Sequence, residues 1–488
     1  MNVVSSAKKA PHRDVVNVVV ASDLCIGCGV CAAVCPSRLL TMDWSAQGEL
    51  VPDIMGECPP KCDLCLVVCP FTGEGPDQDK LSALRFGALP DIHRRDDLGY
   101  FLECYAGHAA DAADRGRGAS GGVLRTLLRS LLDQGFVDRV VCVTTGPGTS
   151  SSDLFQFDIV EQSAAINDLP SSAYYPAELS QALRTIFTDK EDRRYAVVGL
   201  PCVLHGVNLA MAKLPRLRQR IAFTIALVCG QLPNRSYTEY LATAAGAPWK
   251  EVKAVSYRSK VDSTMASNFA FVAQRRDGGP THPVWLHGGA SRLWTGGYFK
   301  HNACNCCDDV FGEVADAAVM DAWLPRFVND PRGHSLVVVR SPALREVLHN
   351  MAHDGLCVLE PIAADEVARS QANVLHKKKW LIQGYLFAAQ RAGRWMPSRR
   401  LSPSREIWLR GWWTLFLARW VMVASKRHWP KIRDTGSASV LHRAMWPVEV
   451  LLWVRSFLQH VQDKLKRLCR RCSDKRIRTT VTTKKPTP

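Results

Sequence analysis

The middle of the chain alternates between short apolar runs and stretches whose apolar residues recur at helical spacing. Residues 139–145 (RVVCVTT) and 221–228 (IAFTIALV) are mostly apolar and of strand length, whereas 123–132 (VLRTLLRSLL) gathers its apolar residues on one helical face. The pattern predicts strands at 139–145, 195–200, 221–228, 252–258, 269–275, 335–340 and 356–362, and helices at 123–132, 178–188, 235–245 and 342–353. Strands that alternate with helices indicate an α/β body.

The N-terminal part has a different pattern. Residues 1–16 are predicted as a loose arm, and the valine-rich run at 15–21 is predicted as a strand that is too short for a signal peptide. Residues 73–97 are polar and rich in turn-forming residues, which predicts a linker. No run of 18 apolar residues is present, so the sequence predicts no transmembrane helix.

Charge is distributed unevenly along the chain. The formal net charge is +16, and the residues from 395 onward hold 21 Lys or Arg but only 5 Asp or Glu, so the residues before them are neutral overall. Eight of the 14 tryptophans lie in the same tail. Residues 405–425 and 444–471 have the apolar spacing of long helices, and 476–488 are predicted to be disordered. Residues 395–475 are therefore predicted as a basic, mostly helical tail, and the net charge says nothing about the ligands of the body.

The number and spacing of the cysteines give the first indication of a chemical function. The chain has 18 cysteines, eight of them between Cys25 and Cys69. A cytoplasmic chain keeps its thiols reduced, so this density indicates metal binding rather than disulfides. The two cysteine runs are Cys25-x₂-Cys28-x₂-Cys31-x₃-Cys35-Pro36 and Cys58-x₃-Cys62-x₂-Cys65-x₃-Cys69-Pro70. The first has the spacing of one half of a bacterial two-cluster ferredoxin, and the second differs by one extra residue.

Residues 17–72 are therefore predicted as a small ferredoxin-like α+β module with two 4Fe–4S clusters. Gly27 and Gly29 would let the backbone approach the sulfides. The resemblance to two-cluster ferredoxins implies crossed ligation, with one cluster on Cys25, Cys28, Cys31 and Cys69 and the other on Cys35, Cys58, Cys62 and Cys65. The alternative is a pair of Cys₄ zinc sites, which the doubled spacing with Cys-Pro disfavours.

Four stretches of the body resemble the family of the coenzyme F(420) hydrogenase beta subunit, which includes plant hydroxymethyl-chlorophyll a reductase. They are residues 117–123 (RGASGGV), 198–202 (VGLPC), 256–260 (SYRSK), and Cys304-x₂-Cys307-Asp308 followed by Ala315-Asp316. They occur in the order of the family within about residues 98–365. The resemblance implies that 98–190 and 191–390 correspond to the N-terminal and C-terminal parts of that subunit. It also implies an iron–sulfur flavoprotein.

Two polar stretches are candidates for holding the flavin. Ser120, Gly121 and Gly122 open a predicted helix whose free N–H groups suit a phosphate, and the resemblance makes this the phosphate of FAD. The alternative is an N-cap serine with a close-packed glycine pair. The spacing Gly116-x-Gly118-x-x-Gly121 also matches a dinucleotide fingerprint, but residues 108–115 (HAADAADR) are not predicted as the strand that the fingerprint requires.

The second stretch lies at a predicted strand end and contains Tyr257, Arg258 and Lys260. Its cations would hold a phosphate or stabilise a reduced, anionic flavin. The alternative is a solvated strand terminus. No residue is assigned to the chemical step itself.

Four cysteines of the body are candidates for a third cluster. Cys202 and Cys229 each follow an apolar strand, where side chains reach the ligand crevice of an α/β sheet, and Cys304 and Cys307 share one loop. Alternatively, Cys202 and Cys229 are small buried apolar residues. The other cysteines are interpreted as a non-ligand (Cys306), as packing residues (Cys104, Cys142 and Cys357), and as a pair without an assigned metal (Cys469 and Cys472).

Together these features predict an oxidoreductase. Clusters would exchange single electrons with a protein such as ferredoxin, and FAD would join them to two-electron chemistry. The resemblance implies coenzyme F(420) or a conjugated organic compound as the small-molecule substrate. The alternative function is a non-catalytic electron-transfer subunit of a larger redox complex.

The tail has its own predicted partner. Tryptophans flanked by cations suit a membrane interface, and an amphipathic helix pair suits a protein partner equally well. Nucleic acid is not expected, because aromatic residues crowded into an apolar helix are poorly placed to stack on bases. The chain is therefore predicted to be cytoplasmic, with peripheral attachment to the inner face of a membrane or to a protein through its tail.

Overall fold

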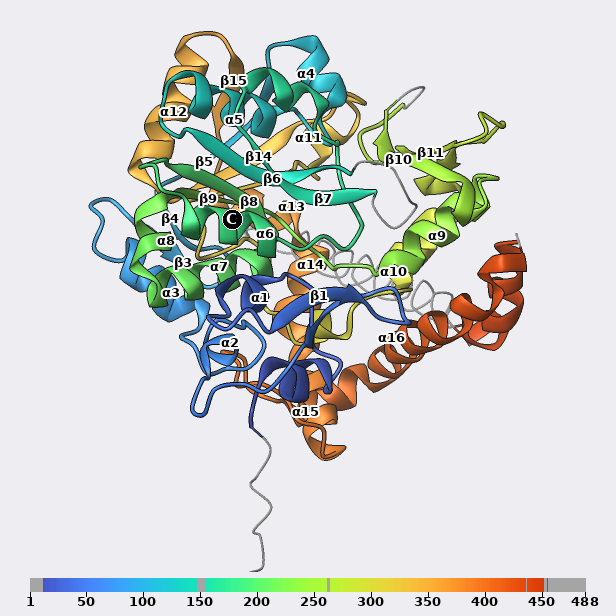
Figure 1. The fold of residues 1–488 in the computed structure, drawn as a ribbon. Helices are drawn as coiled ribbons and strands as arrows, with labels where there is room; N and C mark the ends of the chain where they lie inside the picture. Colours follow the sequence, from blue (N-terminus) through green and yellow to red (C-terminus); the bar gives the residue numbers. More distant parts are fainter. Residues whose placement is uncertain (1–11, 147–153, 261–263, 436, 452–453, 455–488) are drawn as a thin grey trace, which may run out of the picture.

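The structure, a computed structural model, describes residues 12–146, 154–260, 264–435, 437–451 and 454. Its largest element is an eight-stranded sheet with the strand order β15-β5-β14-β13-β9-β8-β6-β7 (Figure 1). These strands are β5 Glu103–Ala109, β6 Arg139–Thr145, β7 Phe155–Val160, β8 Tyr195–Gly199, β9 Ile221–Leu227, β13 Ala317–Asp321, β14 Ser335–Val339 and β15 Cys357–Pro361. Strands β6, β8, β9 and β13 are parallel to one another, and the remaining pairings are antiparallel. The predicted α/β body is confirmed.

Helices cover both faces of this sheet (Figure 1). The covering helices are α5 Val123–Asp133 and α12 Pro342–His353 on one face, and α6 Ser180–Thr188, α7 Pro201–Lys213 and α8 Pro215–Arg220 on the other. Successive residues of β8 enter opposite cores, because Val197 packs on the α6 and α7 side and Val198 on the α5 and α12 side. Burial on both faces explains why these strands are continuous apolar runs in the sequence.

The strands and helices predicted for the body are all present, within one or two residues of their predicted ends. Strands β5, β7 and β13 were not predicted, and the sequence of β5, ECYAGHA, is mostly polar or small. Strand β5 nevertheless lies inside the sheet, since β14 and β15 pair with its two edges. Strand β5 ends at Ala109, and α4 (Ala112–Arg117) contains Gly116. Strand β5 therefore includes His108 and Ala109, the first two residues of the stretch that was not predicted as a strand, and α4 begins between β5 and Gly116.

A smaller sheet stands beside the large one and contains two of the predicted strands. It is formed by β10 Val252–Ser259, β11 Ala270–Arg275 and β12 Val284–Trp285, and it packs on α9 Arg235–Ala244. Its core is rich in aromatic side chains, with the ring of Tyr257 5.4 Å from that of Phe271.

The N-terminal module consists of short helices and one hairpin. Its elements are the helical turn η1 Val16–Val20, α1 Val30–Val34, the hairpin strands β1 Leu40–Trp44 and β2 Leu50–Ile54, and α2 Leu64–Val67. The strand predicted at 15–21 is wrong. The Asp14 carboxylate accepts the N–H groups of Val16 at 2.7 Å and Asn17 at 2.9 Å, which starts a helical turn instead. Val15 and Val19, four residues apart, are then both buried.

The segment 73–97, predicted as a linker, is folded against the body. It contains α3 (Gln78–Phe86) and β3 (His93–Arg95), which pairs with β4 (Gly99–Phe101). Asp77 caps α3 by accepting the Lys80 N–H at 2.9 Å. Arg85 of α3 donates to both carboxylate oxygens of Asp316, each at 2.8 Å.

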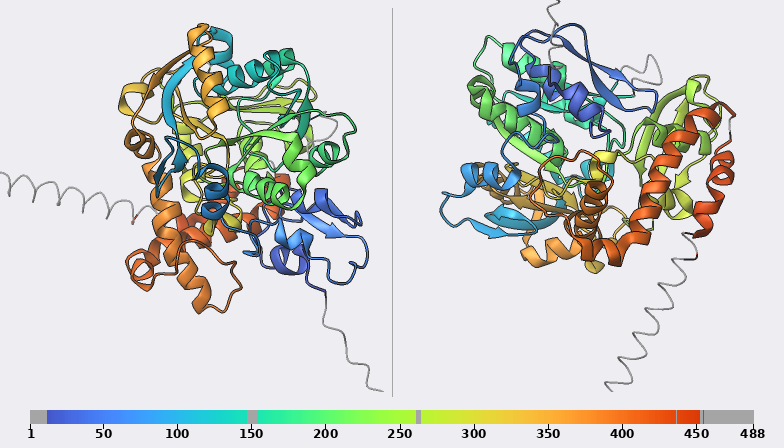
Figure 2. Two further views of the ribbon diagram at one scale, coloured as in Figure 1. Left: turned by 90° about the vertical axis from the view of Figure 1, so that its left-hand side faces the viewer. Right: turned by 90° about the horizontal axis from the view of Figure 1, so that it is seen from below.

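Helices form the C-terminal part. Helix α15 (Ile382–Arg391) packs against α16 (Arg405–Ile432), which runs past α9 (Figure 2), and residues 439–451 are also helical. Trp429 Nε1 donates to Glu239 Oε2 of α9 at 2.9 Å. The helix predicted at 405–425 is confirmed and is longer than predicted. Within the described residues, no helix is both long and apolar enough to cross a membrane. Outside the described residues lie most of the predicted arm, most of the helix predicted at 444–471, the segment 476–488, and Cys469 and Cys472.

Candidate functional site

The eight cysteines of the N-terminal module gather into two groups. Cys25, Cys28, Cys31 and Cys69 line one pocket together with apolar side chains. Burial, followed by the charges of Cys28, Cys25 and Cys69, raises the pKa of the Cys31 thiol well above its usual value. The pocket therefore joins three cysteines of the first sequence run to the last cysteine of the second.

The second group contains the other four cysteines of the module. Burial, then Asp14, Cys62 and Cys35, raises the pKa of Cys58, so Cys35 lies beside the second sequence run. Burial is also the largest cause that raises the pKa of Cys65 to about 11, with smaller contributions from Cys58 and Cys62. The two groups have the membership that crossed ligation requires.

Glycines bring the backbone close to the first group. Gly27 has a φ of +68°, and its N–H donates to Cys25 Sγ at 3.3 Å. A Cβ on Gly27 would lie 2.5 Å from the carbonyl oxygen of Leu50. Both the positive φ and this close approach therefore require glycine at position 27.

Four cysteines of the body lie near one another beside the carboxyl ends of strands β8 and β9. Cys202 lies in the first turn of α7, just after β8, and Cys229 follows β9 by two residues. Cys304 and Cys307 come from the loop before β13, and the Leu232 N–H donates to Cys304 Sγ at 3.3 Å. Burial, then the charges of Cys307, Cys229 and Cys304, raises the pKa of Cys202 well above its usual value. The chain thus brings together four thiols from three separate segments.

A buried lysine faces these four thiols. The ammonium of Lys378, on the helical segment η6 (His376–Leu381), donates to Cys307 Sγ at 3.3 Å and to the carbonyl oxygen of Asp309 at 2.9 Å. Burial by itself lowers the pKa of Lys378, but attraction to the surrounding thiolates raises it overall. The site therefore combines four thiols with one fixed positive charge. Sequence reasoning missed this lysine, because the run Lys377-Lys378-Lys379 looks like a solvated basic stretch.

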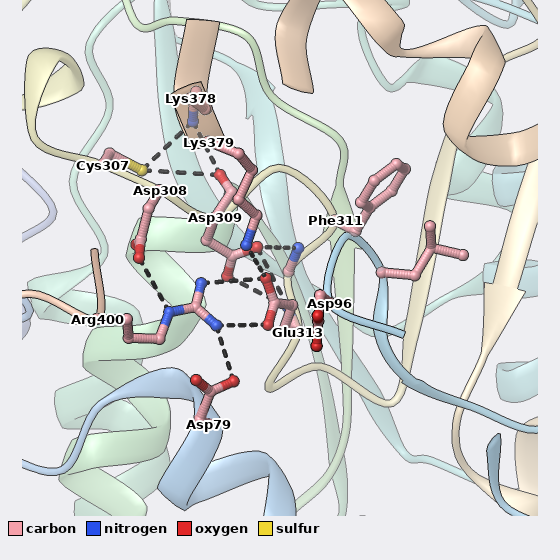
Figure 3. A network of polar contacts seen from close by, with 12 residues as sticks. Asp79, Asp96, Cys307, Asp308, Asp309, Phe311, Glu313, Lys378, Lys379 and Arg400 are labelled. Atoms are coloured by element: carbon pink, nitrogen blue, oxygen red, sulfur yellow. Dashed lines mark hydrogen bonds and ion pairs between the residues drawn. The ribbon is translucent and has the colours of Figure 1, made fainter. Parts of the chain in front are cut away.

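Carboxylates and cations surround the cysteine loop (Figure 3). Arg400 donates to Asp308 at 2.9 Å, to Glu313 at 2.6 Å and to Asp79 of α3 at 3.0 Å. Lys379 donates to Glu313 at 3.0 Å. Burial opposes ionisation of Glu313, but Lys379 and Arg400 together lower its pKa. These ion pairs connect the loop that carries Cys304 and Cys307 to α3 and to the C-terminal segment.

The remaining cysteines of the described residues are buried in the cores of the protein. The Cys306 thiol donates to the carbonyl oxygen of Ala303 at 3.2 Å and lies 3.9 Å from the Arg399 guanidinium. Cys104, Cys142 and Cys357 are buried in the cores of the large sheet. No three His, Cys, Asp or Glu side chains of the described residues converge as a single metal ion would require.

A pocket of about 640 Å³ opens beside the carboxyl end of β6, which is parallel to β8. Thr145 at the end of β6 lines it, together with residues of α4 and β10 and the loop 169–172. Five cationic residues contribute to its wall: Arg117, Arg125, Arg258, Lys260 and Arg332. A pocket of this size and charge suits an anionic ligand as large as a dinucleotide.

Two of the predicted flavin contacts line this pocket. Arg258 donates to Asp321 at 2.8 Å, and this partner, with Tyr174, raises the pKa of Arg258 although burial lowers it. Lys260 donates to the carbonyl oxygens of Arg115, Ser120 and Arg332 at 2.6–2.9 Å. Burial lowers the pKa of Lys260 to about 8. Lys260 thus supplies charge to the pocket and fixes two loops at its rim.

The predicted glycine loop is packed against the sheet. Ser120 Oγ donates to the carbonyl oxygen of His334 at 2.7 Å, and the Gly121 N–H donates to Ser335 Oγ at 3.1 Å. A Cβ on Gly121 would lie 2.6 Å from the carbonyl oxygen of Gly107. Gly122, with a φ of +84°, rather than Ser120, occupies the N-cap of α5. These contacts agree with the alternative of a close-packed glycine pair, except that Ser120 is not the N-cap residue of α5.

Tyr257 also differs from its predicted setting. Its hydroxyl is 2.5 Å from Thr238 Oγ1, and its ring lies 5.3 Å from that of Tyr174 within the core of the small sheet. Strand β10 is irregular between Ser256 and Ser259, and in this stretch Ser256, Arg258 and Ser259 line the pocket whereas Tyr257 does not. Arg258 therefore faces the pocket while Tyr257 faces the core.

Tyr174 lies close to the pocket, two residues after Ser172, which lines it. Burial raises the pKa of Tyr174, and the charges of Arg258 and of Cys229 both act on its hydroxyl. Arg258 lines the pocket, and Cys229 is one of the four thiols. The cationic pocket and the thiol site are thus within electrostatic reach of one side chain.

Family models match three consecutive parts of the chain. Residues 24–72 match the 4Fe-4S dicluster domain, residues 104–184 the N-terminal part of the coenzyme F(420) hydrogenase/dehydrogenase beta subunit, and residues 192–365 its C-terminal part. The tail lies beyond these matches.

Individual proteins are similar to this chain at low identity. An uncharacterized protein of Methanocaldococcus jannaschii is 23% identical over 65% of this chain and 83% of its own length. A subunit of the F(420)H(2) dehydrogenase of Methanosarcina mazei is 24% identical over 70% of this chain and 86% of its own length. A chain of the F(420)-reducing nickel–iron hydrogenase complex from Methanosarcina barkeri aligns with a TM-score of 0.44 and 16% identity, over 59% of this chain and 93% of its own.

The family matches cover both the sheet that carries the four thiols and the module that carries the paired cysteine groups. They confirm the resemblance seen in the sequence motifs. The chain belongs to the family of the coenzyme F(420) hydrogenase/dehydrogenase beta subunit, is an oxidoreductase of that family, and has a 4Fe-4S dicluster domain ahead of the family body.

Proposed function

We propose that the chain is an iron–sulfur flavoprotein that moves electrons between 4Fe–4S clusters and FAD, and onward to a two-electron acceptor such as coenzyme F(420). The observation that carries the proposal is the proximity of the cationic pocket to the thiols of the body at the end of β13. Arg258 of the pocket donates to Asp321, the last residue of β13, at 2.8 Å, and the N–H of Val228, next to Cys229, donates to the carbonyl oxygen of Val319 in the same strand at 3.1 Å. A flavin bound there would exchange single electrons with iron–sulfur clusters and a hydride with an organic substrate.

The proposed ligands follow from the three thiol groups. Four cysteines are the donor set of a 4Fe–4S cluster. The three sets are Cys25, Cys28, Cys31 and Cys69; Cys35, Cys58, Cys62 and Cys65; and Cys202, Cys229, Cys304 and Cys307. Lys378 would offset part of the negative charge of the third set.

The residues that line the pocket change which side chains we propose as flavin contacts. Arg258, held by Asp321, would place a permanent positive charge beside the anionic part of the ligand. Lys260 would act through charge and through the loops that it holds, since it donates to three backbone carbonyl groups. Ser120, Gly121 and Gly122 would support the rim of the pocket from behind rather than bind the phosphate.

The partner is proposed from the surface position of the second thiol group. Each group has one buried and three partly exposed cysteines, but the surroundings of the two groups differ. The residues next to Cys58 and Cys62 (57, 59–61 and 63) are exposed, whereas the residues on either side of Cys25 and Cys28 are buried. A protein carrier such as ferredoxin would therefore exchange electrons at the second group. A relative is named as a subunit of F(420)H(2) dehydrogenase, so we also propose that this chain works as a subunit of a redox complex.

Anaerobic purification with iron, sulfide and flavin counted per chain tests the proposal. We expect about twelve irons and one FAD, because each cubane contains about four irons. The Arg258→Met variant should lose FAD but retain its iron. A wild-type chain with full iron content and no flavin, even after incubation with FAD, would instead support a non-catalytic electron-transfer subunit.

A further inference from the structure

Helix α16 exposes a stripe of large apolar side chains. Leu409, Trp412, Phe416, Trp420 and Val423 are three or four residues apart, so they share one face of the helix. Their exposed fractions run from 37% for Trp420 to 55% for Phe416. At about 1.5 Å per residue, the stripe is about 21 Å long.

The opposite face of α16 is already packed on the body. Leu417, Val421 and Trp429 are fully buried in the core around the small sheet. The Phe299 N–H donates to Ser425 Oγ at 3.0 Å, which fixes the helix from the same side. The exposed stripe is therefore a second apolar face, which the fold of the described residues does not use.

Cations lie along the exposed face. Arg405, Arg419 and Arg427 are exposed and continue the same three- and four-residue spacing. Glu406 is the only acidic residue of α16, and it pairs with Arg410 at 2.8 Å. The whole tail from residue 395 has 21 basic and 5 acidic residues. The face is thus apolar along its centre and positive around it.

The next helical segment has a similar outer face. Trp446, Val450 and Val454 are each four residues apart and have exposed fractions of 65%, 38% and 40%. Leu441, Met445 and Val448 of the same segment are buried, as on the inner face of α16. Two consecutive helical segments therefore each bury one apolar face and expose another that contains tryptophan.

We propose that this outer face docks the protein peripherally on an anionic lipid bilayer. Tryptophan rings settle at headgroup depth, apolar side chains enter the outer part of the acyl region, and arginines meet anionic headgroups. The surrounding positive charge, with almost no acid, complements a negative surface over an apolar layer. The site lies outside the family matches, and the proposal does not depend on the cofactors.

Flotation of the full-length protein with vesicles tests the proposal. We expect the protein to float with phosphatidylcholine vesicles that contain phosphatidylglycerol, and at least ten times less with pure phosphatidylcholine. Binding should be lost in 1 M salt, where the Debye length is about 3 Å. Failure to float with anionic vesicles would overturn the proposal and leave a protein partner for this face.

Matched variants test whether lipid binding depends on this stripe or on any exposed apolar side chain. The triple change Trp412→Ser, Phe416→Ser and Trp420→Ser should reduce flotation at least tenfold, with iron content unchanged as evidence of folding. The control Leu84→Ser removes a side chain that is 82% exposed on α3, and it should float like the wild type. The triple change Arg405→Gln, Arg419→Gln and Arg427→Gln should remove the preference for anionic vesicles. Unchanged flotation of both triple variants would refute the assignment of this face.

Discussion

Replacement of Lys378 by methionine should lower the reduction potential of a cluster bound by the four thiols of the body. The ammonium lies 3.3 Å from Cys307 Sγ and is buried, with 4% of the residue exposed. Reduction adds one negative charge to the cluster, so a fixed cation at this distance stabilises the reduced form more than the oxidised form. Methionine is unbranched and only one heavy atom shorter than lysine, so the change mainly removes the charge and the donor.

The size of the effect follows from the Coulomb interaction. If the added charge is centred about 5 Å from the ammonium, the interaction is about 3 kcal/mol at an effective dielectric constant of about 20. A tenfold change in an equilibrium constant corresponds to about 1.4 kcal/mol, or to about 59 mV for a one-electron couple. The potential should therefore fall by on the order of 100 mV in the Lys378→Met variant.

A redox titration followed by electron paramagnetic resonance measures this shift. Lys379→Met is the matched control, because the neighbouring lysine donates to Glu313 at 3.0 Å instead of to a thiol. We expect a much smaller shift in the control and an unchanged iron content in both variants. Equal potentials in Lys378→Met and wild type, with the iron retained, would refute the assignment of Lys378 as the charge partner of this cluster.

Three other outcomes test the remaining parts of the site. Crossed ligation predicts that Cys35→Ser combined with Cys58→Ser removes about four irons, no more than either change alone, whereas Cys35→Ser with Cys25→Ser removes about eight, as measured by iron analysis. Because burial holds the pKa of Lys260 at about 8, its charge disappears as the pH rises through that value. FAD affinity in fluorescence titrations should therefore fall between pH 7 and pH 9, and Lys260→Met should bind weakly without this step. Gly121→Val should lower the melting temperature, because its Cβ would lie 2.6 Å from Gly107 O, whereas Gly116→Ala, with no atom near its Cβ, should not.

Local sequence signals were sufficient for much of this molecule. Apolar runs located β6, β8, β9, β14 and β15 of the large sheet, because strands that are buried on both faces have few polar positions, but they did not locate β5, β7 or β13. Cysteine spacing indicated which segments would approach one another, and the thiols of the body could be inferred because Cys202 and Cys229 follow adjacent parallel strands. In each of these cases the residue type and its position in an element determine its surroundings.

Long-range contacts explain what the sequence did not reveal. Strand β5 is held by its two neighbours rather than by its own composition. A carboxylate cap at Asp14 converts a valine run from a strand into a helical turn. Lys378 meets Cys307 across 71 positions of sequence, and nothing near Lys378 distinguishes it from Lys379. Arg258 and Tyr257 are adjacent in sequence, and only the packed sheet shows which of them faces the pocket.

The C-terminal segment contacts the N-terminal cysteine module and also forms the exposed apolar face. Arg399 lies 4.7 Å above the ring of Phe71 and donates to the carbonyl oxygen of Pro70, directly after Cys69, at 2.9 Å. Lys426 of α16 donates to Glu49 of the N-terminal module at 2.7 Å, and both residues are buried. Truncation before α16 would therefore leave Glu49 without its cation, at a cost of about 3–5 kcal/mol for a broken buried ion pair. Loss of lipid binding in a truncated chain would then not distinguish a missing docking face from a loosened iron–sulfur module. Substitutions on the outer face of α16 avoid this ambiguity, because they leave the inner contacts of Arg399 and Lys426 in place.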